Sequence, residues 1–98
     1  MIRIIYSWKV PPENLELFTQ TWKRTTNQIH KNVTGARGSF MLQSDSDTTA
    51  IKTIARWDCL EDWEQFWQDS KPSQMQAMHD LAERTSVEIY NEVEDFTK

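Results

Sequence analysis

The sequence predicts an α+β fold in which helices cover one face of a four-stranded antiparallel sheet. Three observations carry this prediction. Four segments alternate apolar and polar residues as strands do, apolar residues recur at helical spacing in the regions between them, and glycines and prolines stand at the boundaries of these segments. A chain of 98 residues has room for one core, so we expect a single domain over residues 1–98.

The first strand is predicted at residues 2–10, where one side is apolar and the other carries most of the polar residues. The apolar side holds Ile2, Ile4, Tyr6, Trp8 and Val10. Pro11 and Pro12 end this strand, and a helix follows. Its apolar stripe holds Leu15, Phe18, Trp22, Thr25, Thr26 and Ile29. His30 lies in the last turn, where a basic residue suits the negative end of the helix dipole, and we expect that structural role for it.

Two strands at residues 38–44 and 48–58 then form a hairpin. The acidic residues of its turn, Asp45 and Asp47, are typical of a solvated loop and predict no metal site. A second helix begins after Asp58, which forms a capping-box pattern with Glu61. Its apolar face is expected to hold Leu60, Trp63, Phe66 and Trp67.

Ser73 and Gln76 repeat the capping pattern after Pro72 and predict a third helix. Its stripe holds Met75, Met78 and Ala82, and His79 lies at the border of that stripe. A last strand at residues 86–94 completes the order β-α-β-β-α-β, with the second helical region split in two. This is the ferredoxin-like arrangement, which leaves one sheet face without helices.

The face without helices is expected to mix apolar and charged side chains, which suits a dimer interface as well as it suits water. The expected residues are Ile5, Met41, Ile54 and Tyr90 beside Arg3, Lys52, Arg56 and Glu88. The chain carries 11 basic and 15 acidic residues, a net charge of −4. The basic residues are scattered, so we expect no nucleic-acid partner. No apolar stretch is long enough for a membrane span, no signal peptide is recognisable, and Cys59 is the one cysteine. These features favour a cytoplasmic protein.

Five tryptophans in so short a chain could fill a core or line a pocket, because large rings rarely interlock without gaps. Trp22 and Trp63 lie in the middle of their stripes, which favours the core. Trp67 lies in the last turn of its helix, a position that is compatible with either the core or a pocket wall. At the border of its stripe, His79 is more typical of a partly buried, hydrogen-bonded histidine than of a ligand-binding one.

One pattern spans most of the chain. A strand ends in Arg-Trp, an aromatic residue follows about six positions later, then a tryptophan, a serine, and a histidine in the next helix. The residues are Arg56, Trp57, Trp63, Trp67, Ser70 and His79. With the opening strand "MIRIIYSWKV" and the helix that carries Phe18 and Trp22, the whole sequence resembles the antibiotic biosynthesis monooxygenase domain family.

The resemblance implies a homodimeric α+β barrel, with two sheets face to face and one cavity per subunit between sheet and helices. Some members of this family oxidise quinol-like or polyketide aromatics with O₂ and no cofactor, some degrade haem, and many have no known activity. The leading hypothesis is that this chain binds a small aromatic or hydrophobic molecule and oxidises it with O₂ without a cofactor. His79 would be the acid or base and Trp67 the cavity wall, while Tyr6, Ser7, Trp63, Phe66 and Arg56 would contact the ligand.

Two alternatives stay open. The protein could be a non-catalytic dimeric module whose tryptophans only fill the core, because a filled core and an aromatic pocket use the same residues. Haem degradation is the third hypothesis. That branch of the family uses an asparagine on the first strand, where this chain has Tyr6, Ser7 and Trp8.

Overall fold

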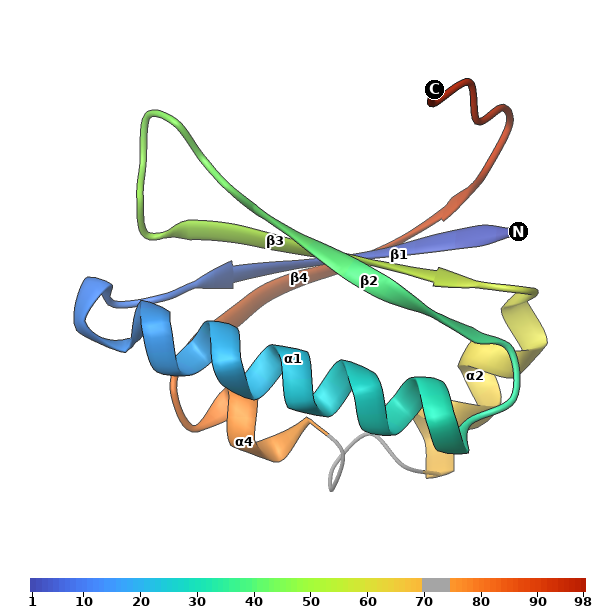
Figure 1. Ribbon diagram of the computed structural model, residues 1–98, viewed down its shortest axis with the longest axis horizontal. Helices are drawn as coiled ribbons and strands as arrows, with labels where there is room; N and C mark the ends of the chain where they lie inside the picture. The colour runs from blue at the N-terminus through green and yellow to red at the C-terminus, as the bar shows by residue number, and fades with distance from the viewer. Residues whose placement is uncertain (70–74) are drawn as a thin grey trace.

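The computed structural model describes residues 1–69 and 75–98 and has the predicted ferredoxin-like order (Figure 1). Strand β1 (Ile2–Lys9) is followed by a short 3-10 turn (Pro12–Asn14) and helix α1 (Leu15–Asn32). Strands β2 (Ala36–Gln43) and β3 (Ala50–Trp57) form the predicted hairpin. Helices α2 (Leu60–Asp69) and α4 (Gln76–His79) precede the last strand, β4 (Glu83–Asn91).

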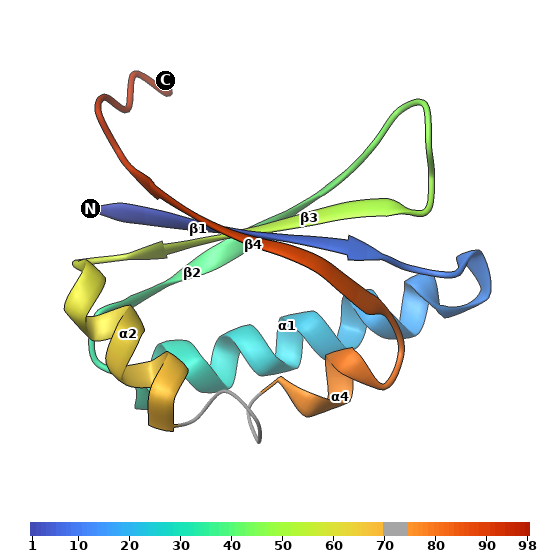
Figure 2. The same cartoon turned by 180° about the vertical axis from the view of Figure 1, so that it is seen from behind.

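The four strands form one antiparallel sheet in the order β2-β3-β1-β4. Strand β1 therefore lies in the middle, with Ile2 opposite Trp57 of β3 on one side and Asn91 of β4 on the other. Helices α1, α2 and α4 lie on one face of the sheet (Figures 1 and 2). Among the described residues the other face carries no helix, as predicted.

The core lies between the sheet and the helices. The inward side chains of β1, from Ile2 to Trp8, are all buried, as strand alternation requires. Trp8 is held there by a hydrogen bond from its Nε1 to Thr53 Oγ1 (3.1 Å) and by an edge contact with Phe18 of α1. The alternation predicted for the first strand is therefore confirmed.

Two details of the predicted strands were wrong. Strand β4 spans Glu83–Asn91 instead of residues 86–94, and Val93 beyond it is 95% exposed. Met41 lies on the helix side, because it pairs with the buried Thr53. Phe40 and Leu42 face the open side instead and are about half exposed. The register of β2 shifts between Ala36 and Ser39, a local irregularity that alternation alone does not reveal.

The start of α2 also differs from the prediction. Leu60, predicted on the apolar face of this helix, is exposed. Asp58 was predicted to cap the helix, but its carboxylate accepts two 2.8 Å hydrogen bonds from the guanidinium of Arg37 on β2. Met75, directly before α4, and Met78 within it are buried as predicted. Ala82, predicted in the same helical stripe, lies beyond the end of α4 and before β4, where it is half-buried. The expected roles of Ser70, Pro72 and Ser73 fall outside the described residues.

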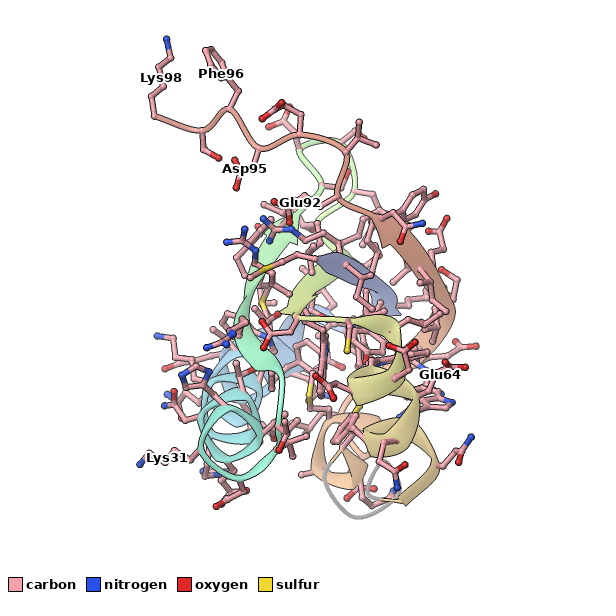
Figure 3. The ribbon with its side chains drawn as sticks, turned by 90° about the vertical axis from the view of Figure 1, so that its right-hand side faces the viewer. Lys31, Glu64, Glu92, Asp95, Phe96 and Lys98 are labelled. Atoms are coloured by element: carbon pink, nitrogen blue, oxygen red, sulfur yellow. The ribbon has the colours of Figure 1, made fainter. Side chains whose placement is uncertain are left out.

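The C-terminal residues rise over the open face of the sheet (Figure 3). Arg3 and Arg56 lie opposite each other on that face. Both form ion pairs with Glu92, at 3.2 and 3.1 Å, and both lie within 4 Å of Asp95. Phe96 follows and is 78% exposed.

Candidate functional site

A cavity of about 50 Å³ lies between α1 and the sheet. The sheet contributes Tyr6 from β1, Ser39 from β2 and Ala55 from β3. Phe66 of α2 contributes an aromatic wall, and Met75 and Met78 close the cavity from the side of α4. These six groups are mostly apolar, and Tyr6 and Ser39 each add a hydroxyl. Such a lining is typical of a site for a small, mostly apolar molecule.

Helix α1 supplies the wall opposite the sheet. Thr25 and Ile29 lie one turn apart on the same face, because residues four positions apart lie above one another on a helix, and His30 directly follows Ile29. Trp22 lies one turn before Thr25 and also lines a second, wider groove between the first half of α1 and strands β2 and β3. Its Nε1 donates a hydrogen bond to Ser39 Oγ (3.4 Å), which ties the helix to β2. Trp22 was predicted as a core residue, and it is half-buried at the cavity wall.

Tyr6 is the buried, titratable hydroxyl-bearing residue of the cavity lining, which also includes the buried Thr25 and Thr53. Its hydroxyl accepts a 3.0 Å hydrogen bond from Trp63 Nε1, and its own O–H can donate to a bound molecule. Burial raises the pKa of Tyr6 to about 12, although the Trp63 hydrogen bond and the charge of Arg84 oppose the rise. The phenol therefore stays protonated near neutral pH, and Tyr6 is a hydrogen-bond donor in a dry site.

Trp63 and Trp67 stand behind Tyr6. Their rings stack with centroids 5.1 Å apart, and the Trp67 ring lies 6.1 Å from that of Tyr6. Trp63 is buried, as predicted, while Trp67 is half-buried with the Arg84 guanidinium 4.8 Å over its ring. Neither residue lines the cavity in the described part of the chain. Trp63 and Trp67 therefore contact Tyr6 and not the cavity itself.

His79 lies elsewhere. It lines a wide, open groove beside Pro11, Asn14 and Leu81, and its ring packs against Trp8 with centroids 5.3 Å apart. The residue as a whole is exposed. Partial burial lowers the pKa of His79, and the nearby positive charge of Arg84 adds to this effect. The structure does not place His79 and Tyr6 around one cavity.

Ser7 and Arg56 occupy different surroundings. Ser7 points to the open face, where its hydroxyl accepts a 2.8 Å hydrogen bond from Lys52 Nζ. Because neighbouring residues of a strand point to opposite faces, Tyr6 and Ser7 are on opposite sides of the sheet. Arg56 contributes to the cavity lining near Gly38. Its Nε is buried and has no hydrogen-bond partner among the described residues.

The structure adds one titratable residue that the sequence did not indicate, because His30 lines the cavity. Its Nδ1 lies 3.0 Å from the carbonyl oxygen of Ala36. Thr26, four residues earlier on α1, lines the same cavity. The predicted stripe of this helix ended at Ile29, and His30 was assigned to the helix end alone. Thr26 belongs to the predicted stripe, so extending that stripe by four residues is the signal that would have included His30. The return of the chain through Ala36, which brings β2 next to this last turn, is not visible in the spacing.

Neither a metal centre nor a membrane span is found in the described part of the chain. Among residues 1–69 and 75–98, no group of three or more His, Cys, Asp or Glu side chains could hold a metal ion. Within the same residues, no helix is both long enough and apolar enough to cross a bilayer.

Comparison with known families gives a match over most of the chain. The family model for antibiotic biosynthesis monooxygenase matches residues 1–81. This stretch holds every cavity residue named above and ends just before β4. No curated protein sequence matches.

Solved structures share the fold at low sequence identity. SnoaB from Streptomyces nogalater, described as a cofactor-independent oxygenase, has a TM-score of 0.77 and 12% identity, covering 99% of this chain and 97% of its own. The heme-degrader MhuD from Mycobacterium tuberculosis, solved with two hemes bound in its active site, has a TM-score of 0.80 and 13% identity, covering 99% of this chain and 100% of its own. A conserved protein from Methanosarcina mazei has a TM-score of 0.73 and 15% identity, covering 91% and 89%.

Proposed function

This chain belongs to the antibiotic biosynthesis monooxygenase family, and from that premise we propose that it binds a small aromatic molecule in the α1 cavity and oxidises it with O₂ without a cofactor. The observation that carries the proposal is the cavity itself, which has mostly apolar walls and a buried, protonated phenol. The likeness to a cofactor-independent oxygenase supports it at the level of fold.

The chemistry requires an electron-rich substrate, because no cofactor supplies electrons. A hydroquinone fits this need once it has lost a proton. For 1,4-dihydroxynaphthalene the balanced reaction with one O₂ gives 2-hydroxy-1,4-naphthoquinone and one water. The substrate supplies all four electrons, one oxygen atom enters the ring and the other leaves as water. The protein would exclude bulk water and hold the reacting oxygen atoms in place.

Within this proposal the residues have different parts. Tyr6 and Phe66 contact the ligand directly, and Arg56 contributes the edge of the lining. Trp63 positions the Tyr6 hydroxyl through its indole N–H, and Trp67 supports both rings by stacking. We assign no binding role in this cavity to Ser7 or His79, because one faces the opposite side of the sheet and the other lines a different groove.

The size of the cavity limits how a ligand enters. A cavity of about 150 Å³ accepts benzene, and this one measures about 50 Å³. A ring must therefore displace part of the wall. Met75 and Met78 are suited to that movement, because an unbranched thioether side chain adapts its shape easily. Trp22 is the second side chain suited to such a movement, because it is half-buried and lines both the cavity and the wider groove next to it.

We also propose that two copies associate through the open face of the sheet. Phe40, Leu42 and Tyr90 are each about half exposed there, and Ile5 and Ile54 lie between them. A twofold axis would place this patch against its own copy, so the same apolar side chains would cover each other. In a chain this small, such burial would add appreciably to stability.

Oxygenation of 1,4-dihydroxynaphthalene under ¹⁸O₂ tests the enzymatic proposal. We expect 2-hydroxy-1,4-naphthoquinone with one ¹⁸O atom, formed faster than without protein. Spontaneous oxidation gives 1,4-naphthoquinone and H₂O₂ instead, so the products separate the two routes. Ala55→Leu, which adds carbon atoms to the cavity wall, should abolish the reaction, while Ala77→Leu on the exposed side of α4 should not. Equal rates for both variants and the wild type would contradict the proposal.

A non-catalytic binding module is the second candidate function. It is favoured by the position of His79 outside the cavity and by the burial of Trp8, Trp57 and Trp63. It predicts binding of aromatic molecules without any labelled product. Substitutions of these tryptophans would then lower the melting temperature through the cavities they create.

Haem degradation fits this chain less well. Haem is many times larger than the cavity described above, and the expected histidine ligand lines another groove. The residues present do not form a haem site, and we derive no step that involves haem. Titration with haemin should give no change in the haem absorbance spectrum, and a stoichiometric change would contradict this reading.

A further inference from the structure

We propose that His30 recognises a hydroxyl group of the ligand and accepts its proton, which makes phenols and hydroquinones the preferred ligand class. This inference rests on the proposed binding of an aromatic molecule in the α1 cavity. It stands on the position of His30 in the cavity lining and on the contact that fixes its ring.

The contact with Ala36 determines which ring nitrogen carries a proton. A carbonyl oxygen only accepts hydrogen bonds, so the 3.0 Å contact requires His30 Nδ1 to donate. In the neutral imidazole, Nε2 then has no proton and presents a lone pair. The ring offers an acceptor at the one nitrogen that Ala36 does not use. A hydroxyl donor is its chemical complement.

The place of His30 also suits proton transfer. The residue lies in the last turn of α1 and is exposed, although it contributes to the cavity lining. A proton accepted from a ligand could therefore pass to water without crossing the core. Two ionisable side chains on neighbouring elements lie near His30: Tyr6 on β1 lines the same cavity, and Asp62 on α2 lies against Gly35, next to Ala36. Arg56 on β3 is also part of the lining, but its guanidinium pairs with Glu92 on the open face of the sheet.

Tyr6 and His30 give the lining two opposite hydrogen-bonding properties. The Tyr6 phenol is protonated and can donate to a ligand oxygen, while His30 Nε2 can accept from a ligand hydroxyl. Apolar and aromatic groups make up most of the wall between them. An aromatic ring that carries at least one hydroxyl group satisfies this pattern, and a pure hydrocarbon does not.

A pair of ligands that differ in one hydrogen-bond donor tests the inference. The probes are 1-naphthol and 1-methoxynaphthalene, and isothermal titration calorimetry gives their affinities. The wild type should prefer 1-naphthol by roughly 3- to 10-fold, the contribution of one hydrogen bond. Two variants separate the two ring nitrogens. In His30→Asn the amide nitrogen can replace Nδ1 toward Ala36 but nothing replaces Nε2, whereas in His30→Gln an amide oxygen reaches further out and can accept.

We expect His30→Asn to bind both probes equally and to melt at the wild-type temperature, and His30→Gln to keep part of the preference. His79→Asn is the matched control and should keep all of it, because His79 lines a different groove. Full preference in His30→Asn would overturn the inference, as would a wild type that binds both probes equally. A wild type that binds neither probe would overturn the proposed function as well, so the two failures are distinguishable.

Discussion

Trp63 Nε1 donates a 3.0 Å hydrogen bond to the hydroxyl of Tyr6, and both side chains are buried. This bond joins α2 to the middle strand of the sheet. It satisfies an indole N–H that would otherwise be buried without a partner, and it fixes the phenol that faces the cavity.

Removing the acceptor should destabilise the protein. Tyr6→Phe leaves the Trp63 N–H buried and unpaired, and we expect the free energy of unfolding to fall by roughly 1–3 kcal/mol. Urea denaturation followed by circular dichroism measures it. Tyr90→Phe is the control, because that hydroxyl bonds Glu88 on the surface. Equal losses of unfolding free energy in the two variants would show that the buried hydrogen bond stabilises the protein no more than the surface one.

The high pKa of Tyr6 predicts a loss of stability in alkali. The folded state keeps the Tyr6 proton up to about pH 12, whereas an unfolded tyrosine releases it near pH 10. Between these two values the unfolded state binds fewer protons, so the free energy of unfolding falls as pH rises. We expect a decrease of roughly 2 kcal/mol across this window. Tyr6→Phe should lack this component, and an unchanged slope in that variant would contradict the assignment.

The two glycines predict a contrast in stability. Gly35 and Gly38 both have positive φ, at 85° and 95°, where an alanine costs roughly 1–2 kcal/mol. A Cβ at Gly35 would also collide with the Asp62 carboxylate, while at Gly38 no atom of the described residues lies within 4 Å. Gly35→Ala should therefore destabilise more than Gly38→Ala in urea denaturation. The double variant Gly35→Ala/Asp62→Ala should regain only the stability that Gly35→Ala loses beyond Gly38→Ala. If the double variant regains no stability, the collision with Asp62 is not the cause of that extra loss.

Charges on the open face should separate the proposed dimer. Leu42→Glu places a carboxylate in the exposed apolar patch, where a twofold axis brings like charges together. Sedimentation velocity at micromolar concentration should show a dimer for the wild type and a monomer for this variant. Leu17→Glu is the control, because Leu17 is 53% exposed on α1, on the helix side of the sheet. A dimer that survives Leu42→Glu would place the interface elsewhere.

Sequence patterns predicted the elements well and the site only in part. Alternation correctly identified the inward side chains of β1, because this strand pairs with β3 and β4 on its two sides and keeps a regular alternation of buried and less buried residues. It failed for Met41, because the register shift in β2 depends on pairing with another strand. The resemblance implied His79 as the acid or base, and His30 was expected to have a structural role at the helix end. Helix spacing links His30 to the predicted stripe through Thr26, but that His30 meets a cavity depends on the return of the chain through Ala36 beneath α1.

The position of β1 in the middle of the sheet has a consequence for synthesis of the protein. Strand β1 is synthesised before its partner β4, and Ile2 pairs with Asn91, 89 residues further along the chain. Until β4 emerges, one edge of β1 has unpaired N–H and C=O groups that can bind a neighbouring chain. Contacts this distant in sequence also form slowly. A chain that stops before residue 83 is therefore expected to aggregate, because it lacks the strand that covers this edge of β1.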